Sequence, residues 1–567
     1  MNHTVHQRSF FRIPFLLAAA CWSCSATAPP MATPKAPTAP VLPPPPWEAR
    51  QSVADRPAAS VVSDPAAGPA SRAPTAGAPP VVIRNATLML ATGATIERGT
   101  IVLQGGKIAA VGAGELPAPA GATIIDGTGK FVTPGIIDTH SHLGVYAMPD
   151  AQAHEDGNEA TDPITPQVHT IDAFWPQDPS IERAVAGGVT TIQVLPGSAN
   201  LIGGRAVTLK LYPHRSPRDM HFPGAPDGLK MACGENPKRV YGQNHRMPST
   251  RMGNLAVQRA AFLKAQKLER DWARWRAAET HRAMALGKKR AAYEAKREER
   301  ERQQAFCRTH GGSTSCHKWR AEWNKPLEEP DPTEPMPPPD RDMGMETLTG
   351  ALAGRVLVHI HCYRADDMLD MIALADEMGF KIRSFHHSLE AYKIRDVLKD
   401  RGIAASTWAD WWGFKMEAFD GIPENAALLH EAGVRPIIHS DSAEGIQRLN
   451  QEAGKALASG RRAGIALTEA DAIRWITLYP AWALGVDERT GSLEVGKDAD
   501  VVLWNKNPFS VYAAAEKVWI DGAPVYTRGA PHWSDFEVQA RPEPEPRTED
   551  GGPPRGPAPV QTQGGAR

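Results

Sequence analysis

The sequence has almost no net charge and lacks any long apolar run. Its 567 residues include 63 Lys and Arg against 64 Asp and Glu, a formal net charge of −1 at pH 7. A composition balanced in this way gives no indication of a nucleic-acid partner or of binding to an anionic membrane surface. No apolar run approaches the roughly 20 residues that cross a bilayer. The chain is too long for one small domain, and its apolar side chains suffice for a large core.

The first residues are typical of an export signal. Arg8 and Arg12 precede a short apolar run, residues 13–20, and Cys21 follows directly. A basic segment followed by an apolar segment predicts an export leader, here residues 1–28, although this apolar run is short.

The end of this apolar run, AAAC at residues 18–21, resembles a bacterial lipoprotein cleavage box. In that reading Cys21 becomes the lipidated first residue, although Ala18 stands where Leu is usual. Ordinary cleavage after Ala26 or Ala28 and a disordered cytosolic leader are the alternatives. We therefore expect an exported protein that is periplasmic or held at a membrane by a lipid anchor on Cys21.

Two segments have a composition that cannot pack a core. Residues 29–80 are dominated by Pro and Ala and include VLPPPPW, and residues 538–567 are rich in Pro and Gly. Such segments predict a disordered tether and a disordered tail. A tether fits a catalytic domain that is held off a membrane.

Cysteine is scarce, with six in the whole chain. Cys307 and Cys316 are close enough in sequence for a disulfide that closes a short loop, which exported proteins commonly form. The same segment, CRTHGGSTSCH, also contains His310 and His317, but its spacing matches no strong zinc pattern. A disulfide is our prediction, with a zinc knuckle and free thiols as alternatives.

The two ends of the folded region have similar sequence patterns. Residues 81–130 and 487–530 both consist of short alternating apolar runs separated by Gly and Asn breaks, such as GTIVLQGGKIAAVG and AEKVWIDGAPVY. This pattern predicts short strands with turns. Because the two segments flank a long middle, we expect them to build one small β-sandwich together.

The middle, residues 131–486, alternates apolar strands with helical stretches such as ADDMLDMIALADEMG. Eight strand–helix alternations predict an α/β fold with a TIM-type (β/α)8 barrel, whose chemistry lies at the carboxyl ends of the strands. The candidate strands are FVTPGIID, TTIQVLPG, GRAVTLKL, GLKMACGEN, VLVHIH, KIRSFHH, GIAASTW and VRPIIHSD.

A charged segment interrupts the barrel pattern at about residues 255–340. Its first part has Phe262, Leu268, Trp272 and Trp275 near helical spacing, and its second part, KKRAAYEAKREERERQQ, is nearly all charged. We expect a solvated helix that projects from the barrel, with a partner-binding arm as the alternative.

The first candidate strand ends in two histidines, within FVTPGIIDTHSH. His140 and His142 are two residues apart, and residues at that spacing in a strand point to the same face. Two imidazoles on one face are able to grip a metal ion, although one HxH is also compatible with a polar strand end. Three further strands end in metal-binding residue types, namely His359 and His361, His386 and His387, and His439 and Asp441. Imidazole and carboxylate together are the ligands expected for zinc or a similar ion.

These residues lie in motifs that resemble the amidohydrolase superfamily, in its imidazolonepropionase-like branch. The motifs are VTPGIIDTHSHLG, AVAGGVTTIQVLPGSANLIGGRAVTLK, GLKMACGENPKRVYG, HIHCYRADDM, HSLEAYKI, IIHSDS and GSLEVGKDADVVLW. The resemblance covers about residues 81–528. It implies a (β/α)8 barrel, a composite β-sandwich and one or two divalent metals, zinc in the first instance, with iron or manganese as alternatives.

The resemblance also implies the ligands, position by position. His140 and His142 match the first-strand pair, His361 the fifth-strand His, His387 the sixth-strand His and Asp441 the eighth-strand Asp. The remaining histidines of these motifs are then neighbours that pack or support the ligands, and they are His359, His386 and His439.

The bridging ligand is open between two residues. Binuclear members of the superfamily use a carboxylated Lys on the fourth strand, and Lys230 fits that place by strand order. Other members use a Glu, and Glu235 at the end of the same strand fits that role. We favour Lys230.

The expected reaction is hydrolysis of a carbon–nitrogen bond in a small molecule, a cyclic amide, an amidine or an N-acyl or dipeptide-type substrate. A metal-activated hydroxide attacks the carbon, and Asp441 takes the proton and passes it to the leaving nitrogen. Arg364 and Tyr363 lie near the site and are candidates for substrate binding, with a local salt bridge as the alternative for Arg364. A metallodipeptidase or carboxypeptidase-like activity, or an inactive surface-tethered binding module, remain the alternative functions.

Overall fold

The computed structural model describes residues 78–330 and 334–530. The predicted leader with Cys21, nearly all of the predicted tether and the predicted tail lie outside these residues. Within the described ranges, no helix combines the length and the apolar character needed to cross a membrane.

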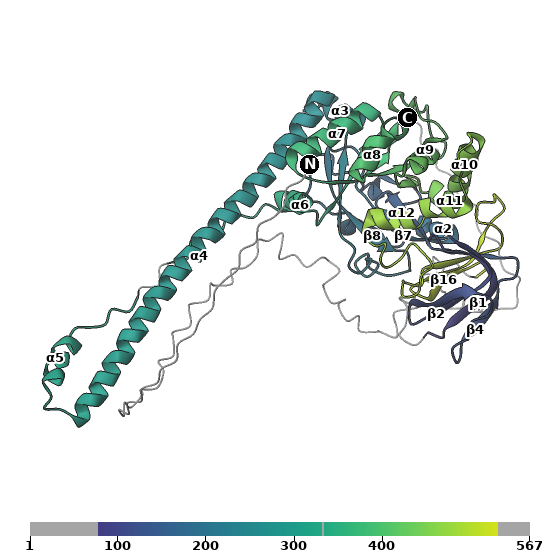
Figure 1. Cartoon of the computed structure of the whole chain (residues 1–567). Coiled ribbons are helices and arrows are strands. Elements are labelled where there is room, and N and C mark those ends of the chain that lie inside the picture. Colours follow the sequence, from purple (N-terminus) through teal and green to yellow (C-terminus); the bar gives the residue numbers. More distant parts are fainter. Residues whose placement is uncertain (1–77, 331–333, 531–567) are drawn as a thin grey trace, which may run out of the picture. The chain divides into compact units, whose positions relative to one another are not determined.

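The centre of the fold is an eight-stranded sheet whose spatial order follows the sequence, from β6 to β13. Figure 1 labels two of its strands, β7 and β8. The sheet is nearly closed, because the Asp441 amide beyond the last strand donates to the His140 carbonyl of the first strand at 3.0 Å. All eight predicted strands are present. They are β6 (Ile136–Ser141), β7 (Val189–Val194), β8 (Ile202–Lys210), β9 (Gly228–Ala232), β10 (Leu357–Cys362), β11 (Ile382–His387), β12 (Ala404–Thr407) and β13 (Pro436–Ile438).

One strand departs from the predicted alternation of parallel strands and helices. β8 pairs antiparallel with both β7 and β9, while the other neighbouring pairs are parallel. Only residues 195–201 join β7 to β8, and a parallel connection needs a crossover of a dozen or more residues. The carboxyl end of β8 therefore lies at the opposite end of the barrel from the other strand ends.

The first predicted strand, residues 131–138, is divided by Gly135 into two strands of different sheets. β5 (Phe131–Pro134) pairs with strands of the terminal segments, and β6 begins the barrel. A Cβ on Gly135 would lie 2.1 Å from the Thr190 hydroxyl oxygen, so only glycine allows the chain to pass this close to β7.

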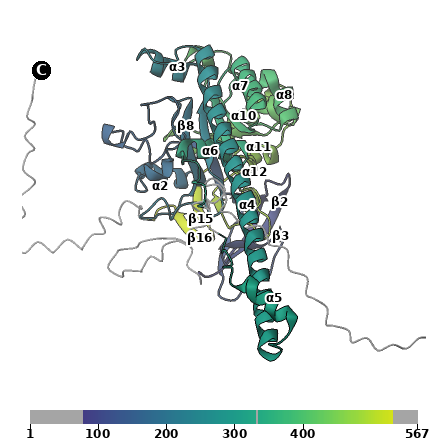
Figure 2. The same cartoon turned by 90° about the vertical axis from the view of Figure 1, so that its left-hand side faces the viewer.

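Helices cover the outer face of the barrel, and Figure 2 shows several of them from the side. In α7 the apolar residues Met368, Met371, Ile372 and Ala375 recur at helical spacing and pack into one core cluster. Gly379 ends this helix in the left-handed conformation with φ 84°. The helices with their bounds are α2 (Pro179–Ala186), α3 (Glu235–Gly242), α6 (Met343–Leu352), α7 (Ala365–Met378), α8 (Arg395–Arg401), α9 (Asn425–Ala432), α10 (Leu449–Arg462), α11 (Glu469–Trp475) and α12 (Leu478–Leu484).

The two terminal segments of the described chain form a second eight-stranded sheet. Its order is β16-β15-β14-β5-β1-β2-β3, and β4 pairs with β1. The segments therefore combine as predicted into one composite sheet, while a sandwich of two facing sheets stays a prediction. The strands are β1 (Val81–Met89), β2 (Thr95–Gln104), β3 (Lys107–Ala113), β4 (Thr123–Asp126), β5, β14 (Val501–Trp504), β15 (Ala515–Ile520) and β16 (Ala523–Thr527).

A buried lysine ties the barrel to this composite sheet. Lys210 ends β8 and forms ion pairs with Asp498 at 2.9 Å, with Asp500 at 3.2 Å and with Asp521. The lysine side chain is fully buried, so its charge depends on these carboxylates. The antiparallel course of β8 is what brings Lys210 to this end of the barrel.

Residues 278–335 form a unit of their own. It contains the second part of the long helix α4 (Arg251–Thr309) and the short helix α5 (Thr314–Trp323). The structure joins Cys307 and Cys316 by a disulfide with a Cα–Cα distance of 5.6 Å. With both sulfurs in this bridge, the alternative zinc knuckle has no thiolate ligands.

Candidate metal centre

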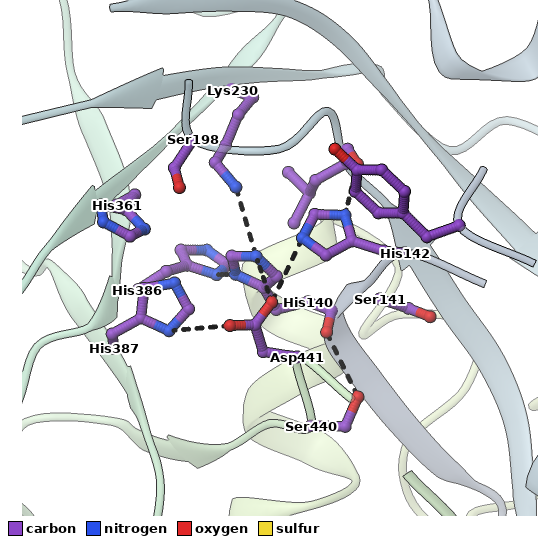
Figure 3. A network of polar contacts seen from close by, with 12 residues as sticks. His140, Ser141, His142, Ser198, Lys230, His361, His386, His387, Ser440 and Asp441 are labelled. Carbon is purple, nitrogen blue, oxygen red and sulfur yellow. Dashed lines mark hydrogen bonds and ion pairs between the residues drawn. The ribbon is translucent and has the colours of Figure 1, made fainter. Parts of the chain in front are cut away.

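The candidate centre lies where the first and last strands of the barrel end (Figure 3). Asp441 places its Oδ1 atom 3.2 Å from His142 Nε2 and 3.5 Å from His140 Nε2. The Nε2 atoms of the two histidines and an oxygen of Asp441 thus converge on one point. The structure therefore brings together the predicted first-strand pair and the predicted eighth-strand Asp.

Two further histidines lie next to this group. His387 ends β11, and His439 directly follows β13. Donor atoms of His140, His387 and His439 lie within 4.8 Å of one another, as do those of His140, His142 and Asp441. His387 Nδ1 and both ring nitrogens of His439 are buried and have no hydrogen-bond partner. Buried polar atoms without hydrogen-bond partners are rare in proteins. The nitrogen of a neutral imidazole is a common metal ligand, so a bound cation would satisfy these atoms.

His439 is predicted to be a neighbour that packs or supports ligands, and its place in the group with His140 and His387 makes it a candidate ligand as well. Its ring centroid lies 5.2 Å from that of His140 and 4.9 Å from that of His387. His439 and Asp441 both lie directly beyond the end of β13, at the rim where the other strands end.

Hydrogen bonds behind the histidines fix the orientation of their rings. His142 Nδ1 lies 2.9 Å from the Leu195 carbonyl oxygen and must donate to it, which orients Nε2 towards Asp441. His140 Nδ1 lies 2.9 Å from His386 Nδ1, and His386 Nε2 lies 3.0 Å from His359 Nδ1. His359 and His386 therefore support the inner histidines, in the role predicted for them.

His361 lies beside the group but is not part of either set of converging donors. Its ring centroid is 4.5 Å from that of His387, and its Nδ1 atom is buried without a partner. Its Nε2 atom faces the Asn236 amide nitrogen at 3.3 Å. Burial lowers the pKa of His140, His361 and His387 well below the usual value, so the rings are neutral, as metal ligands must be.

The two candidates for the bridging ligand have different surroundings. Lys230 is buried, and its Nζ atom lies 3.2 Å from His140 Nε2. Burial lowers the pKa of Lys230 to about 7. Glu235 begins α3 and pairs instead with Lys415 at 3.4 Å. The structure thus brings Lys230, and not Glu235, to the converging histidines.

The residues on either side of the Asp441–His140 contact are held by the buried side chain of Asp138. Asp138 accepts hydrogen bonds from the amides of His140 and Ser440, both at 3.1 Å, and from the Ser440 hydroxyl. Burial raises the pKa of Asp441, but the hydrogen bond and charge of His142 outweigh this and bring it below the usual value. Asp441 and His387 both have left-handed backbone conformations, with φ 53° and 70°, which L-residues adopt rarely and mostly at functional sites.

The two residues proposed for substrate binding are placed differently. Arg364 forms a salt bridge with Asp366 at 2.7 Å on the surface, so the structure supports the local alternative for it. Tyr363 is buried and stacks on the His387 ring with a centroid distance of 5.2 Å. Trp408 stacks on the same ring at 4.5 Å. Aromatic side chains thus enclose His387.

Sequence reasoning missed a second disulfide next to the site. Cys233 follows β9 and Cys362 ends β10, and the two are bonded with a Cα–Cα distance of 5.3 Å. The signal was available, because β9 and β10 are neighbours and Ala232 pairs with His361, which makes Cys233 and Cys362 adjacent. All four cysteines of the described residues are therefore in disulfides.

A nearly closed α/β barrel with histidines and an aspartate at its strand ends is a candidate metal-binding barrel. Comparison with known proteins gives the family. The amidohydrolase family model matches residues 407–526. The solved structure of an amidohydrolase from Thermotoga maritima MSB8 is 33% identical in sequence, with a TM-score of 0.62, and the match covers 79% of this chain and all of that chain. The chain belongs to the amidohydrolase family.

Two further relatives match by sequence. The amidohydrolase tasK of Hapsidospora irregularis is 34% identical over 443 residues, which cover 75% of this chain and 39% of that protein. An imidazolonepropionase of Alkaliphilus metalliredigens is 32% identical over 121 residues, which cover 18% of this chain and 28% of that enzyme. The chain therefore spans about two fifths of the Hapsidospora irregularis relative.

Proposed function

We propose that this protein hydrolyses a carbon–nitrogen bond in a small-molecule substrate with the help of one or two divalent metal ions. The observation that supports the proposal is the convergence of neutral imidazole nitrogens with the Asp441 carboxylate at the strand ends. Membership of the amidohydrolase family supports a hydrolase.

The residues present fit a metal. His140, His142 and Asp441 would hold one ion, and His140 also belongs to the second converging group with His387 and His439. Two overlapping groups are compatible with one ion or with two, and His361 lies next to the second group. A bound zinc, iron or manganese ion would supply Lewis-acid chemistry, which acidifies a water and polarises a carbonyl.

We assign the bridging role to carboxylated Lys230. Among the described residues, no carboxylate pairs with the Lys230 ammonium, and burial lowers its pKa to about 7. A substantial fraction of the amine is therefore neutral and nucleophilic at neutral pH, the form that adds to carbon dioxide. The resulting carbamate would bring an anion to a site that otherwise has only Asp441. Glu235 is already paired with Lys415.

Asp441 moves the proton in this proposal. Its lowered pKa keeps the carboxylate ionised and ready to accept a proton at neutral pH. Its Oδ1 atom faces His142 and its Oδ2 atom lies 3.9 Å from His387 Nδ1, so the carboxylate reaches across the centre. The proton that Asp441 takes is then available for the leaving nitrogen.

We also propose that the protein works in an oxidising compartment, as an exported enzyme. The support is the pairing of Cys233 with Cys362 and of Cys307 with Cys316, because structural disulfides persist where thiols are not kept reduced.

The test is a metal analysis of the purified protein together with a substrate panel of N-acyl amino acids, dipeptides and cyclic ureides. We expect bound divalent metal and turnover of at least one of these carbon–nitrogen classes. Dipeptide turnover alone would select the metallodipeptidase alternative. Metal-free protein that hydrolyses nothing in the panel would contradict the proposal and return the inactive binding module to consideration.

A further inference from the structure

A cavity of about 620 Å³ adjoins the candidate metal centre. Its walls come from the segments that follow β12, β13 and β14 and from α10. Much of the lining is apolar, with the aromatic side chains of Trp408, Trp411 and Phe509 and the aliphatic side chain of Leu449. Small-molecule sites are typically concave and apolar, with a few polar groups that fix the ligand.

The cavity reaches the residues of the metal centre. His439 and Ser440, which directly precede Asp441, form part of its lining. His439 is buried, and both of its ring nitrogens lack a hydrogen-bond partner. Trp408 stacks on His387 on one side and contributes to the cavity on the other. A molecule in this cavity would therefore have one end beside the proposed reaction centre.

Two cationic side chains line the cavity, and only one of them is in an ion pair. Lys455 pairs with Asp410 at 2.8 Å and with Glu452 at 2.6 Å. Arg448 forms no direct ion pair or side-chain hydrogen bond with any of the described residues, although its charge acts on the Glu452 carboxylate of the same lining. A second, smaller cavity is lined by His142 and Asp441. Glu444 lines both cavities and therefore lies in the wall between them. Its carboxylate accepts a hydrogen bond from the Ser442 hydroxyl at 2.9 Å.

We propose that this cavity is the substrate pocket of the enzyme and that Arg448 binds a carboxylate of the substrate. The substrate class is an amide with an apolar body and a terminal carboxylate, such as an N-acyl derivative of an aromatic or aliphatic amino acid. A planar guanidinium binds a carboxylate through two parallel hydrogen bonds, which fixes the orientation of the ligand. This assignment rests on the proposed function, and it replaces Arg364, which is occupied by Asp366.

The test compares two probes by isothermal titration calorimetry with the full-length protein, 2-benzyl-4-oxopentanoic acid and its primary amide, in which a methylene replaces the scissile amide nitrogen of N-acetylphenylalanine. The probes differ in the carboxylate that Arg448 would bind. We expect the acid to bind wild type about 10- to 100-fold more tightly than the amide, the range expected for a charge-assisted hydrogen bond. Arg448→Gln should remove this preference, and Arg448→Lys should recover part of it.

Lys381→Gln is the control, because it removes one positive charge from an exposed side chain that does not line the cavity. The preference should survive in this variant. Equal affinity for acid and amide, no binding of either probe, or equal losses in Arg448→Gln and Lys381→Gln would overturn the proposal.

Kinetics separates this inference from the proposed function. On an N-acyl amino acid that the enzyme turns over, Arg448→Gln should raise KM about 10- to 100-fold and change kcat little. If the protein prefers the carboxylate probe but hydrolyses no substrate, the proposed hydrolase function is wrong while carboxylate binding by Arg448 is supported. Hydrolysis of N-acyl amino acids with an unchanged KM in Arg448→Gln would refute the pocket and leave the function standing.

Discussion

His142 Nε2 lies 3.2 Å from Asp441 Oδ1, although one residue follows the first strand of the barrel and the other follows the last. The contact exists because the sheet nearly closes, with the Asp441 amide bonded to the His140 carbonyl. The His142 ring is held from behind by the Leu195 carbonyl, so its other nitrogen, Nε2, faces Asp441. Two distant segments thereby form one candidate binding site.

His142→Ala should lower bound metal and abolish turnover. The change removes one of the nitrogens that converge with Asp441, and a metal that loses a ligand from a small set binds far more weakly. Metal content by atomic emission and activity on the best substrate of the panel are the measurements. His245→Ala, an exposed histidine, is the control and should leave both unchanged. Normal metal content in His142→Ala would remove this residue from the site.

Asp441→Asn should retain most of the metal but lower kcat by about 10²–10⁴-fold, the usual cost of losing a general base. The amide keeps an oxygen ligand and the shape of the side chain but does not accept a proton. The measurement is kcat together with metal content in the same preparation. If kcat stays near the wild-type value, proton transfer must be assigned to another residue.

His439→Asn should reduce metal affinity or kcat about 10- to 100-fold, the range typical of groups around a metal site. The position of His439 in the converging group with His140 and His387 is the reason. A metal titration and kcat at saturating metal decide between the two effects. Wild-type values in both would restore the originally predicted role of a packing residue.

Lys230 should carry a carbamate in the active protein. Exchange with ¹³C-labelled bicarbonate should give one carbamate resonance in the carbon NMR spectrum, absent from Lys230→Met. Glu235→Gln is the control and should keep both the resonance and the activity, since Glu235 pairs with Lys415 outside the converging group. If activity is lost in Glu235→Gln and kept in Lys230→Met, Glu235 is the bridging ligand and Lys230 is not.

His221 should make the protein less stable as the pH falls below neutral. Burial lowers the pKa of His221 from 6.5 to about 4, so the ring is neutral in the folded state and charged in the unfolded state between these values. The unfolded state then binds more protons, and stability that is fully present above pH 6.5 is lost towards pH 4. By pH 5 the loss amounts to about 2 kcal/mol.

Urea unfolding of wild type and His221→Gln at pH 7.5 and pH 5 measures this effect. The wild-type midpoint should fall more than that of the variant, while His245→Gln should follow the wild type. Parallel shifts in wild type and His221→Gln would show that His221 does not titrate as proposed.

Much of the barrel is readable from the sequence because each strand is a short apolar run that ends in polar residues. His140 and His142 are a local signal, since two residues on one strand share a face whatever the rest of the fold does. The convergence of His387 and Asp441 with this pair follows once parallel strands are arranged in order, because their carboxyl ends meet at one rim.

Other features depend on how the chain connects in space. The antiparallel course of β8 follows from the short link of residues 195–201, a constraint of length and not of apolar pattern. The Cys233–Cys362 bridge required the register of β9 against β10. The local pairing of Arg364 with Asp366 was one of two readings that the sequence allowed equally.

The most direct test of the central claim is a chelation and reconstitution experiment on the purified wild-type protein. Metal content and turnover of the best carbon–nitrogen substrate are measured before chelation, after chelation and after stepwise addition of zinc, iron or manganese. We predict that activity disappears with the metal and returns in proportion to the metal rebound, up to one or two ions per chain. Full turnover by protein stripped of metal would contradict the account.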